Sequence, residues 1–88
     1  MKIIKRNGAE ATFDISKIIM AVTKANAAVE EGDRMTPRQI QRIAESGELA
    51  CQELGRSAAV EEIQDMVETQ NMANGACEVA MAYITYRY

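Results

Sequence analysis

The dipeptide Asn7-Gly8 is the feature that most restricts how this chain begins to fold. It lies between two short apolar runs. Asn-Gly in that setting is one of the strongest local signals for a β-hairpin, because both central residues of a type I′ turn need φ > 0. A two-residue turn would place Lys5 opposite Glu10 on the neighbouring strand. The turn also carries Lys5 and Arg6, so the hairpin is predicted to form a small basic flap.

Four helices are predicted after the hairpin, because apolar residues recur there at helical spacing. Asp14 is suited to cap the first helix, and the segment 36–39 (Thr-Pro-Arg-Gln) has the order of a capping box with proline at the first helical position. The predicted helices cover residues 15 to 26–29, 37–54, 60–72 and 77–86, and residues 56–59 form a connector with one extended step. The predicted fold class is therefore α+β, mostly α, with the N-terminal β-hairpin packed as a lid on a four-helix bundle, since a hairpin alone would be unstable.

Length and charge restrict the possible functions. The chain has 88 residues, enough for a single domain over residues 1–88, and its last residue follows a helix directly, so we expect a domain from a longer protein. The net charge of −3 argues against a general nucleic-acid binder. All four lysines lie in the first 24 residues, whereas most carboxylates come later. A local basic site on an acidic body suits a small anionic ligand, although solvated surface charges would give the same pattern.

Several kinds of chemistry are missing from the sequence. The chain has no histidine and no C-x-x-C pair, so we expect no zinc site and no Ser-His or Cys-His catalytic pair. No phosphate-binding loop or dinucleotide fingerprint is present, and we expect no catalysis by this domain alone. Cys51 and Cys77 are predicted to be small core residues. Without a signal peptide or a membrane-length apolar run, the expected setting is the reducing cytoplasm, with no membrane partner.

Binding chemistry is better supported than catalysis. Lys17 lies in the first turn of the first helix, where a cation opposes the helix dipole and backbone N–H groups are available to an anion. Lys5, Arg6 and Lys17 together can clamp a polyphosphate. The alternative is that Lys5 pairs with Glu10 and Lys17 points into solvent. Four apolar residues can either sandwich a flat base or belong to the core: Ile4, Phe13, Ile18 and Val22.

Three blocks of sequence resemble the ATP-cone domain. The opening Ile-Ile-Lys-Arg-Asn-Gly at 3–8, followed by Phe13-Asp14 and Lys17-Ile18, resembles the start of that family. The string at 60–68 (Val-Glu-Glu-Ile-Gln-Asp-Met-Val-Glu) resembles its third helix, and the string at 78–87 resembles its last helix. The blocks occur in the family's order and span nearly the whole chain. The opening is most similar to the N-terminal regulatory domain of the anaerobic ribonucleoside-triphosphate reductase.

The resemblance implies a regulatory role. It implies an allosteric domain that binds ATP as activator or dATP as inhibitor, with Mg, and controls a ribonucleotide reductase through subunit association. The implied partners are the catalytic domain of the parent reductase and its other subunits, with no direct nucleic-acid contact. An alternative is the nucleotide-sensing domain of a reductase-gene transcriptional repressor, in which a zinc ribbon precedes the cone. The start at Met1 without zinc ligands favours the reductase. Another alternative is a helical interaction module that binds no nucleotide.

The resemblance also implies a set of nucleotide-binding residues. The phosphates are expected at Lys5, Arg6 and Lys17, with a last basic contact from Arg87. The adenine and ribose are expected against Ile4, Phe13, Ile18 and Val22. Asn7 and Gly8 would shape the flap, and Val60 and Gln64 would face the nucleotide from the third helix. Some relatives have a hydroxyl residue in place of Val60 and a histidine in place of Gln64, so the resemblance leaves the sugar and base contacts of this chain open.

Overall fold

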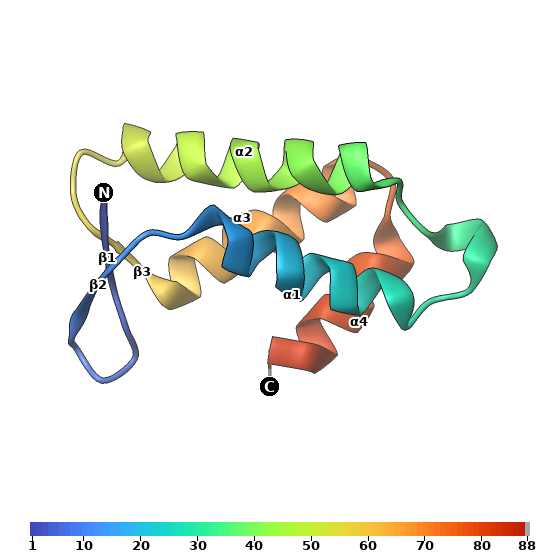
Figure 1. Cartoon of the computed structure of the whole chain (residues 1–88), viewed down its shortest axis with the longest axis horizontal. Helices are drawn as coiled ribbons and strands as arrows, with labels where there is room; N and C mark the ends of the chain where they lie inside the picture. The colour runs from blue at the N-terminus through green and yellow to red at the C-terminus, as the bar shows by residue number, and fades with distance from the viewer. Residues whose placement is uncertain (88) are drawn as a thin grey trace.

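The computed structural model describes the backbone of residues 1–87 and the side chains of residues 1–85 (Figure 1). Its elements, in order, are β1 (Lys2–Ile4), β2 (Glu10–Thr12), α1 (Ile15–Ala27), the 3₁₀ turn η1 (Glu31–Asp33), α2 (Pro37–Glu53), β3 (Ala58–Ala59), α3 (Val60–Ala73) and α4 (Cys77–Arg87). Helices α1 and α3 each pack against both α2 and α4, so the helices form a ring around one core. The strands lie at one end of this bundle. The predicted α+β fold, mostly α, is confirmed.

The turn of the hairpin differs from the two-residue type I′ turn predicted from Asn7-Gly8. The N–H of Gly8 donates to the carbonyl of Lys5 at 2.9 Å, and the N–H of Lys5 donates to the carbonyl of Ala9 at 2.8 Å. Gly8 has φ of +86°, whereas Asn7 has a negative φ. The Asn7 side chain instead accepts a hydrogen bond from the N–H of Ala9 at 3.0 Å. The connection therefore has three residues, with the glycine in the left-handed position.

This turn changes the register of the hairpin. Ile4 lies opposite Glu10, and Ile3 lies opposite Ala11, in an antiparallel pair. The predicted pairing of Lys5 with Glu10 is therefore wrong, because a three-residue connection shifts the partner of Lys5 to Ala9. Since side chains alternate between the faces of a strand, Lys5 projects to the same face as Ile3, and Ile4 projects to the other.

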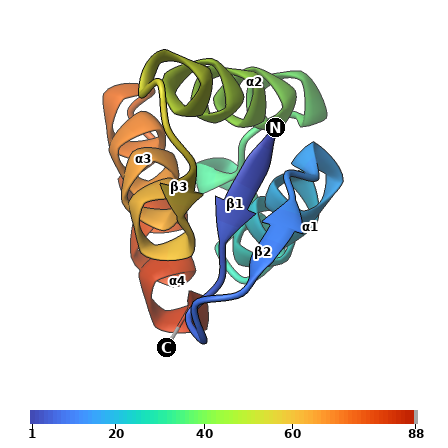
Figure 2. The same ribbon diagram turned by 90° about the vertical axis from the view of Figure 1, so that its left-hand side faces the viewer.

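The connector before α3 forms a third strand. β3 pairs in parallel with β1, with Ile3 opposite Ala58 and Ile4 opposite Ala59, so the strand order is β2-β1-β3 (Figure 2). The predicted extended step is confirmed, but nothing local in the sequence indicated its partner. Because α3 begins directly after β3, the parallel pairing places the first turn of α3 beside the hairpin.

An ion pair holds this junction. Arg56 donates to both carboxylate oxygens of Glu62, at 2.9 and 2.7 Å. Glu62 also accepts a hydrogen bond from the N–H of Ala59 at 3.0 Å, which satisfies a free donor at the start of α3. The hydrogen bonds from Arg56, followed by the one from Ala59, lower the pKa of Glu62 to about 2.

The buried faces of the helices follow the apolar periodicity, except at Cys77, which is exposed, and at Asn71, which is buried. The buried side chains include Ile18, Val22, Ile40, Ile43, Cys51, Ile63, Val67, Val79 and Tyr83. The predicted capping box at Thr36 and Gln39 is confirmed. Cys51 is buried, and burial raises the pKa of its thiol, but Cys77 is exposed at the start of α4, so its predicted place in the core is wrong. Cys77 lies four residues before the exposed Met81, on the face of α4 that is turned away from the core.

Asn71 is the unexpected member of the core. It is completely buried in α3, and its side-chain nitrogen and oxygen have no hydrogen-bond partner among the described residues. An amide buried in this way costs about 1–3 kcal/mol relative to a satisfied one. Its neighbours at helical spacing, Val67 and Ile63, are apolar, so the amide lies on the face of α3 that packs into the core.

Candidate functional site

A cavity of about 260 Å³ lies where the hairpin meets the helices. Four elements surround it: β1, β2 together with the residues that follow it, α1, and α3. Helix α4 adds one aromatic ring, that of Tyr83. The lining residues are Ile3, Lys5, Ala11, Thr12, Phe13, Asp14, Lys17, Ile18, Ala21, Val60, Ile63, Gln64 and Tyr83. Figure 2 shows the three strands between α1 and α3 at this end of the bundle, and the residues of β1 and the end of β2 line the cavity together with those of the two helices.

The periodicities of strand and helix explain which side chains line the cavity. On β1, Ile3 and the following Lys5 share one face because strand side chains alternate. On α1, Lys17 and Ala21 are four residues apart and lie on one helical face. On α3, the same spacing brings Gln64 onto the face of Val60.

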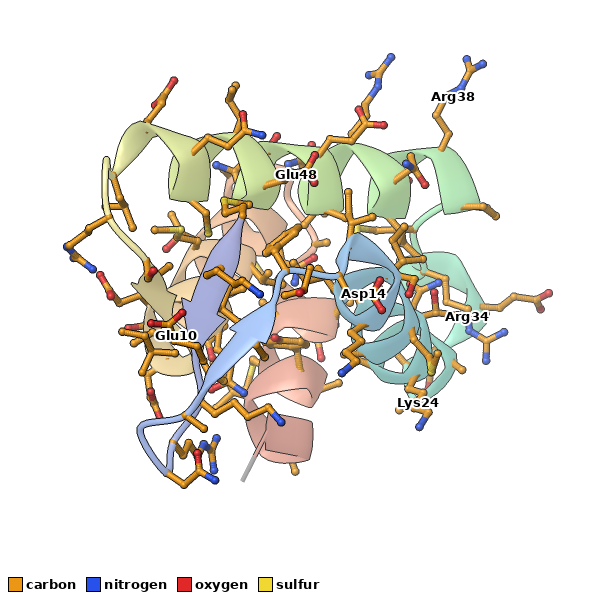
Figure 3. The ribbon with its side chains drawn as sticks, turned by 60° about the vertical axis from the view of Figure 1, so that its left-hand side comes forward. Glu10, Asp14, Lys24, Arg34, Arg38 and Glu48 are labelled. Atoms are coloured by element: carbon orange, nitrogen blue, oxygen red, sulfur yellow. The ribbon has the colours of Figure 1, made fainter. Side chains whose placement is uncertain are left out.

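The cavity carries net positive charge. Lys5 and Lys17 contribute two cations, and Asp14 contributes the one carboxylate among its lining residues. Asp14 is occupied with capping α1, because it accepts hydrogen bonds from the hydroxyl of Ser16 at 2.6 Å and from its N–H at 3.0 Å. These two bonds, with a smaller contribution from Lys17, lower the pKa of Asp14. Figure 3 shows Asp14 where the chain enters α1.

The start of α1 offers fewer free donors than the sequence suggested. The N–H of Ser16 donates to the Asp14 side chain, and the N–H of Lys17 donates to the Asp14 carbonyl at 3.1 Å. The expectation that free N–H groups at this helix end would be available to an anion is therefore wrong for these two groups, since the N-cap already uses them. The cationic chemistry of the cavity comes from the lysine side chains.

The structure brings together half of the residues that the sequence singled out. Six of the twelve line the cavity: Lys5, Phe13, Lys17, Ile18, Val60 and Gln64. Asn7 and Gly8 form the hairpin turn beyond it. Ile4 does not line it, because it lies on the opposite face of β1 and is 37% exposed. Val22 is fully buried in the core below it. The side chain of Arg87 lies outside the described residues.

Arg6 lies outside the cavity, against the first turn of α3. Its Nε is 3.3 Å from a carboxylate oxygen of Glu61. Its Nη2 donates to the side-chain oxygen of Gln64 at 3.4 Å. The tip of the hairpin is therefore tied to α3 by one basic side chain that contacts an acid and an amide.

Seven lining residues were not singled out by sequence: Ile3, Ala11, Thr12, Asp14, Ala21, Ile63 and Tyr83. Most of them could have been found by extending the periodicity from a predicted neighbour. Ile3 lies two residues before Lys5 on the same strand face, and Ala21 lies one helical turn after Lys17. Tyr83 had no such signal, because its position depends on how α4 packs against α1.

The other hollows on the surface have different chemistry. A larger one, of about 570 Å³, lies between the end of α1 and α4, and three of its lining residues are the acids Glu30, Asp33 and Glu78. A second, of about 260 Å³, contains Arg34, whose guanidinium already donates to the carbonyls of Val29 and Ala27. The hairpin cavity is therefore distinguished from these two hollows by its chemistry, since two lysines lie beside an apolar wall in it, and not by being the largest.

Within residues 1–87, no three or more Cys, Asp or Glu side chains come together in a way that could hold a metal ion. In the same part of the chain, no helix combines the length and the apolar character needed to cross a membrane.

Comparison with known proteins agrees with the resemblance of the three sequence blocks. The family model described as the ATP cone domain matches residues 1–88. The chain is 38% identical over 86 residues to the anaerobic ribonucleoside-triphosphate reductase of Haemophilus influenzae, covering 98% of this chain and 12% of that protein. It is 34% identical over 95 residues to the ribonucleoside-diphosphate reductase subunit alpha of Chlamydia trachomatis, covering 99% of this chain and 9% of that protein.

A third reductase type is equally similar. The chain is 37% identical over 87 residues to a vitamin B12-dependent ribonucleoside-diphosphate reductase of Mycobacterium tuberculosis, covering 98% of this chain and 12% of that protein. The chain thus spans only about a tenth of the length of these relatives. Three types of reductase therefore match this chain at similar identity.

Proposed function

The chain belongs to the ATP-cone family, and from that premise we propose that it is an allosteric domain that binds an adenine nucleotide in the hairpin cavity and regulates a ribonucleotide reductase. One observation carries the choice of site: Lys5 and Lys17 lie beside an apolar wall at the closed end of the bundle. A nucleotide needs both parts, an apolar surface for its base and cations for its phosphates.

The cavity is small enough that we expect it to hold the base of the nucleotide while the phosphates extend out of it. Pockets that enclose drug-sized ligands have volumes of roughly 300–1,000 Å³, and this one has about 260 Å³. We therefore place the adenine against Phe13, Ile18 and Val60, with the triphosphate leaving toward Lys5 and Lys17. Arg6 would add a third cation once it leaves α3. Val22 and Ile4 would support the site without touching the nucleotide.

The effectors are ATP as activator and dATP as inhibitor. They differ by one ribose hydroxyl, so their different effects must come from contacts that register that group. A single hydrogen bond contributes roughly 1 kcal/mol, so the two outcomes require either a finely balanced partner interface or different numbers of nucleotides bound per domain. Gln64 and Thr12 are polar side chains of the lining that can make such a contact.

The output is a change in how the reductase subunits associate. The relatives are far longer than this chain, so the catalytic region and the other subunits are the partners that respond to the nucleotide. Magnesium would arrive with the nucleotide, held by phosphate oxygens and water, because Mg²⁺ is commonly bound through substrate phosphates. The carboxylate nearest the site, Asp14, is already engaged by Ser16.

Calorimetric titration of the chain with ATP, dATP and GTP in the presence of magnesium tests the proposal. We expect ATP and dATP to bind and GTP to bind more weakly, because its base presents different polar groups to the same wall. Absence of adenine-nucleotide binding up to millimolar concentration, in a sample that circular dichroism shows to be folded, would overturn the proposal.

Substitution of the two lysines locates the binding. We expect Lys5→Ala and Lys17→Ala each to weaken ATP binding by roughly 10-fold or more, because a hydrogen bond to a charged group contributes about 1.5–3 kcal/mol. Lys24→Ala is the matched control, since it removes the same charge from the last turn of α1, outside the cavity lining. Equal losses in all three variants would mean that general electrostatics, not this cavity, holds the nucleotide.

A further inference from the structure

Glu61 occupies an unusual place beside the hairpin cavity. It lies in the first turn of α3, next to Glu62, but the two acids hold different cations. Glu62 pairs with Arg56 of the connector, whereas Glu61 pairs with Arg6 at the tip of the hairpin. Glu61 and Arg6 are separated by more than half of the chain, so this ion pair exists only because β3 places α3 beside β1.

The ion pair holds Arg6 away from the cavity. The Nε of Arg6 is 3.3 Å from Glu61, and its Nη2 is 3.4 Å from the oxygen of Gln64. Gln64 lines the cavity, but neither Arg6 nor Glu61 does. The guanidinium therefore lies just outside the cavity, bound to an internal carboxylate.

We propose that Glu61 is a positioning residue that competes with an anionic ligand for Arg6, and so lowers the affinity of the hairpin cavity for polyphosphates. This inference rests on the proposed nucleotide function and adds a residue that regulates it. A phosphate oxygen and a carboxylate oxygen use the same N–H donors of a guanidinium. Arg6 must release Glu61 to donate from Nε to a phosphate, and a released Glu61 also repels the phosphates from nearby.

Geometry favours competition over assistance. If Glu61 held Arg6 in its ligand-binding position, the guanidinium would face the cavity, but it is absent from the lining. The side chains of Arg6 and Glu61 are 57% and 51% exposed, so their ion pair is weak enough for a ligand to break. A ligand that binds only when the pair is open has its affinity multiplied by the fraction of molecules in which the pair is open. For an exposed pair, that factor is roughly two- to fivefold.

The affinity test compares Glu61→Gln with the wild-type chain. We expect Glu61→Gln to bind ATP roughly two- to fivefold more tightly and to leave adenosine binding unchanged, because adenosine has no phosphates. In an Arg6→Ala background, the same substitution should lose most of its effect. Glu78→Gln is the matched control: it removes one carboxylate at the start of α4, outside the cavity lining. An effect of Glu61→Gln that persists without Arg6, or weaker ATP binding in Glu61→Gln, would overturn the proposal.

A second measurement does not need adenine binding. In NMR spectra of the chain without nucleotide, the Nε–H signal of Arg6 should shift in Glu61→Gln and stay in place in Glu78→Gln. Titration of the wild-type chain with inorganic tripolyphosphate should move the Arg6 signal in the same direction, at lower concentration in Glu61→Gln. If ATP does not bind but the Arg6 signal behaves in this way, the nucleotide proposal fails and the competition stands. If the Arg6 signal does not respond to the substitution or to tripolyphosphate, the competition is overturned whatever ATP does.

Discussion

Replacing Gly47 by alanine should stabilise this domain. Gly47 lies inside α2, buried against α3, where glycine has no side chain to pack and loses more backbone entropy than alanine on folding. A glycine at such a position is usually explained by a close approach of two helices. Here the nearest atom outside α2 to an added Cβ is Cγ2 of Val67, at 3.9 Å. That is an ordinary van der Waals distance, so the space does not require glycine.

The expected gain can be derived from this geometry. Helix propensity favours alanine over glycine by about 1 kcal/mol in a helix interior. The added methyl group lies on a buried face and contributes up to about 0.8 kcal/mol more. We therefore expect the free energy of unfolding to rise by about 1–2 kcal/mol. In a domain of this size, each 1 kcal/mol raises the melting temperature by about 4–8 °C.

Urea unfolding followed by circular dichroism measures the change. The midpoint should rise while the slope with urea stays constant, because the surface exposed on unfolding is nearly the same. Gly8→Ala is the contrasting variant: its φ of +86° disfavours any Cβ, so it should lose about 1–2 kcal/mol despite open space around it. An unchanged or lower stability of Gly47→Ala would refute the reasoning and show that α2 and α3 need to approach more closely.

Three further predictions concern single side chains. Because the folded state lowers the pKa of Glu62 from 4.5 to about 2, the Glu62 carboxylate stabilises the fold above pH 4.5, and this stabilisation is lost as the pH falls toward about 2. Glu62→Gln should therefore be less stable than the wild type at neutral pH, and acid unfolding curves should show that it loses less stability on acidification. Asn71→Leu keeps the branched shape but removes an amide with no partner, and should raise stability by about 1–3 kcal/mol in urea unfolding; a loss would reveal a partner for the amide. Thr36→Ala removes the N-cap of α2 and should cost about 1 kcal/mol in the same assay, whereas Thr36→Ser should cost little.

The cavity shows which placements follow from local sequence. The positions of Lys5, Phe13 and Lys17 follow from a short strand that leads through a capped turn into a helix, and these interactions are local in the chain. Val60 and Gln64 were assigned only through family resemblance, and their place beside the hairpin depends on a parallel strand pair that no local pattern indicates.

The failures have local and nonlocal causes. The turn was predicted as a two-residue turn because Asn-Gly favours one, but a three-residue connection with Gly8 alone at positive φ satisfies the same dipeptide. That one-residue difference changes the cross-strand partner of Lys5 from Glu10 to Ala9, whereas the face of Lys5 follows from its spacing to Ile3 on β1. Ile4 and Val22, which were predicted to lie against the base, do not line the cavity, because Ile4 lies on the other face of β1 and Val22 is buried in the core.

By itself, the sequence determined the helix caps, the apolar faces of the helices, the hairpin and the clustering of lysines near the start, because each depends on residues a few positions apart. Only the tertiary structure decided which face of β1 closes the bundle, that β3 pairs with β1, and that Arg6 meets Glu61 rather than a neighbour in sequence. Those features depend on contacts between residues tens of positions apart, which form when the apolar faces of four helices are buried together. The basic flap was visible in the sequence, but the acid that holds its arginine was not.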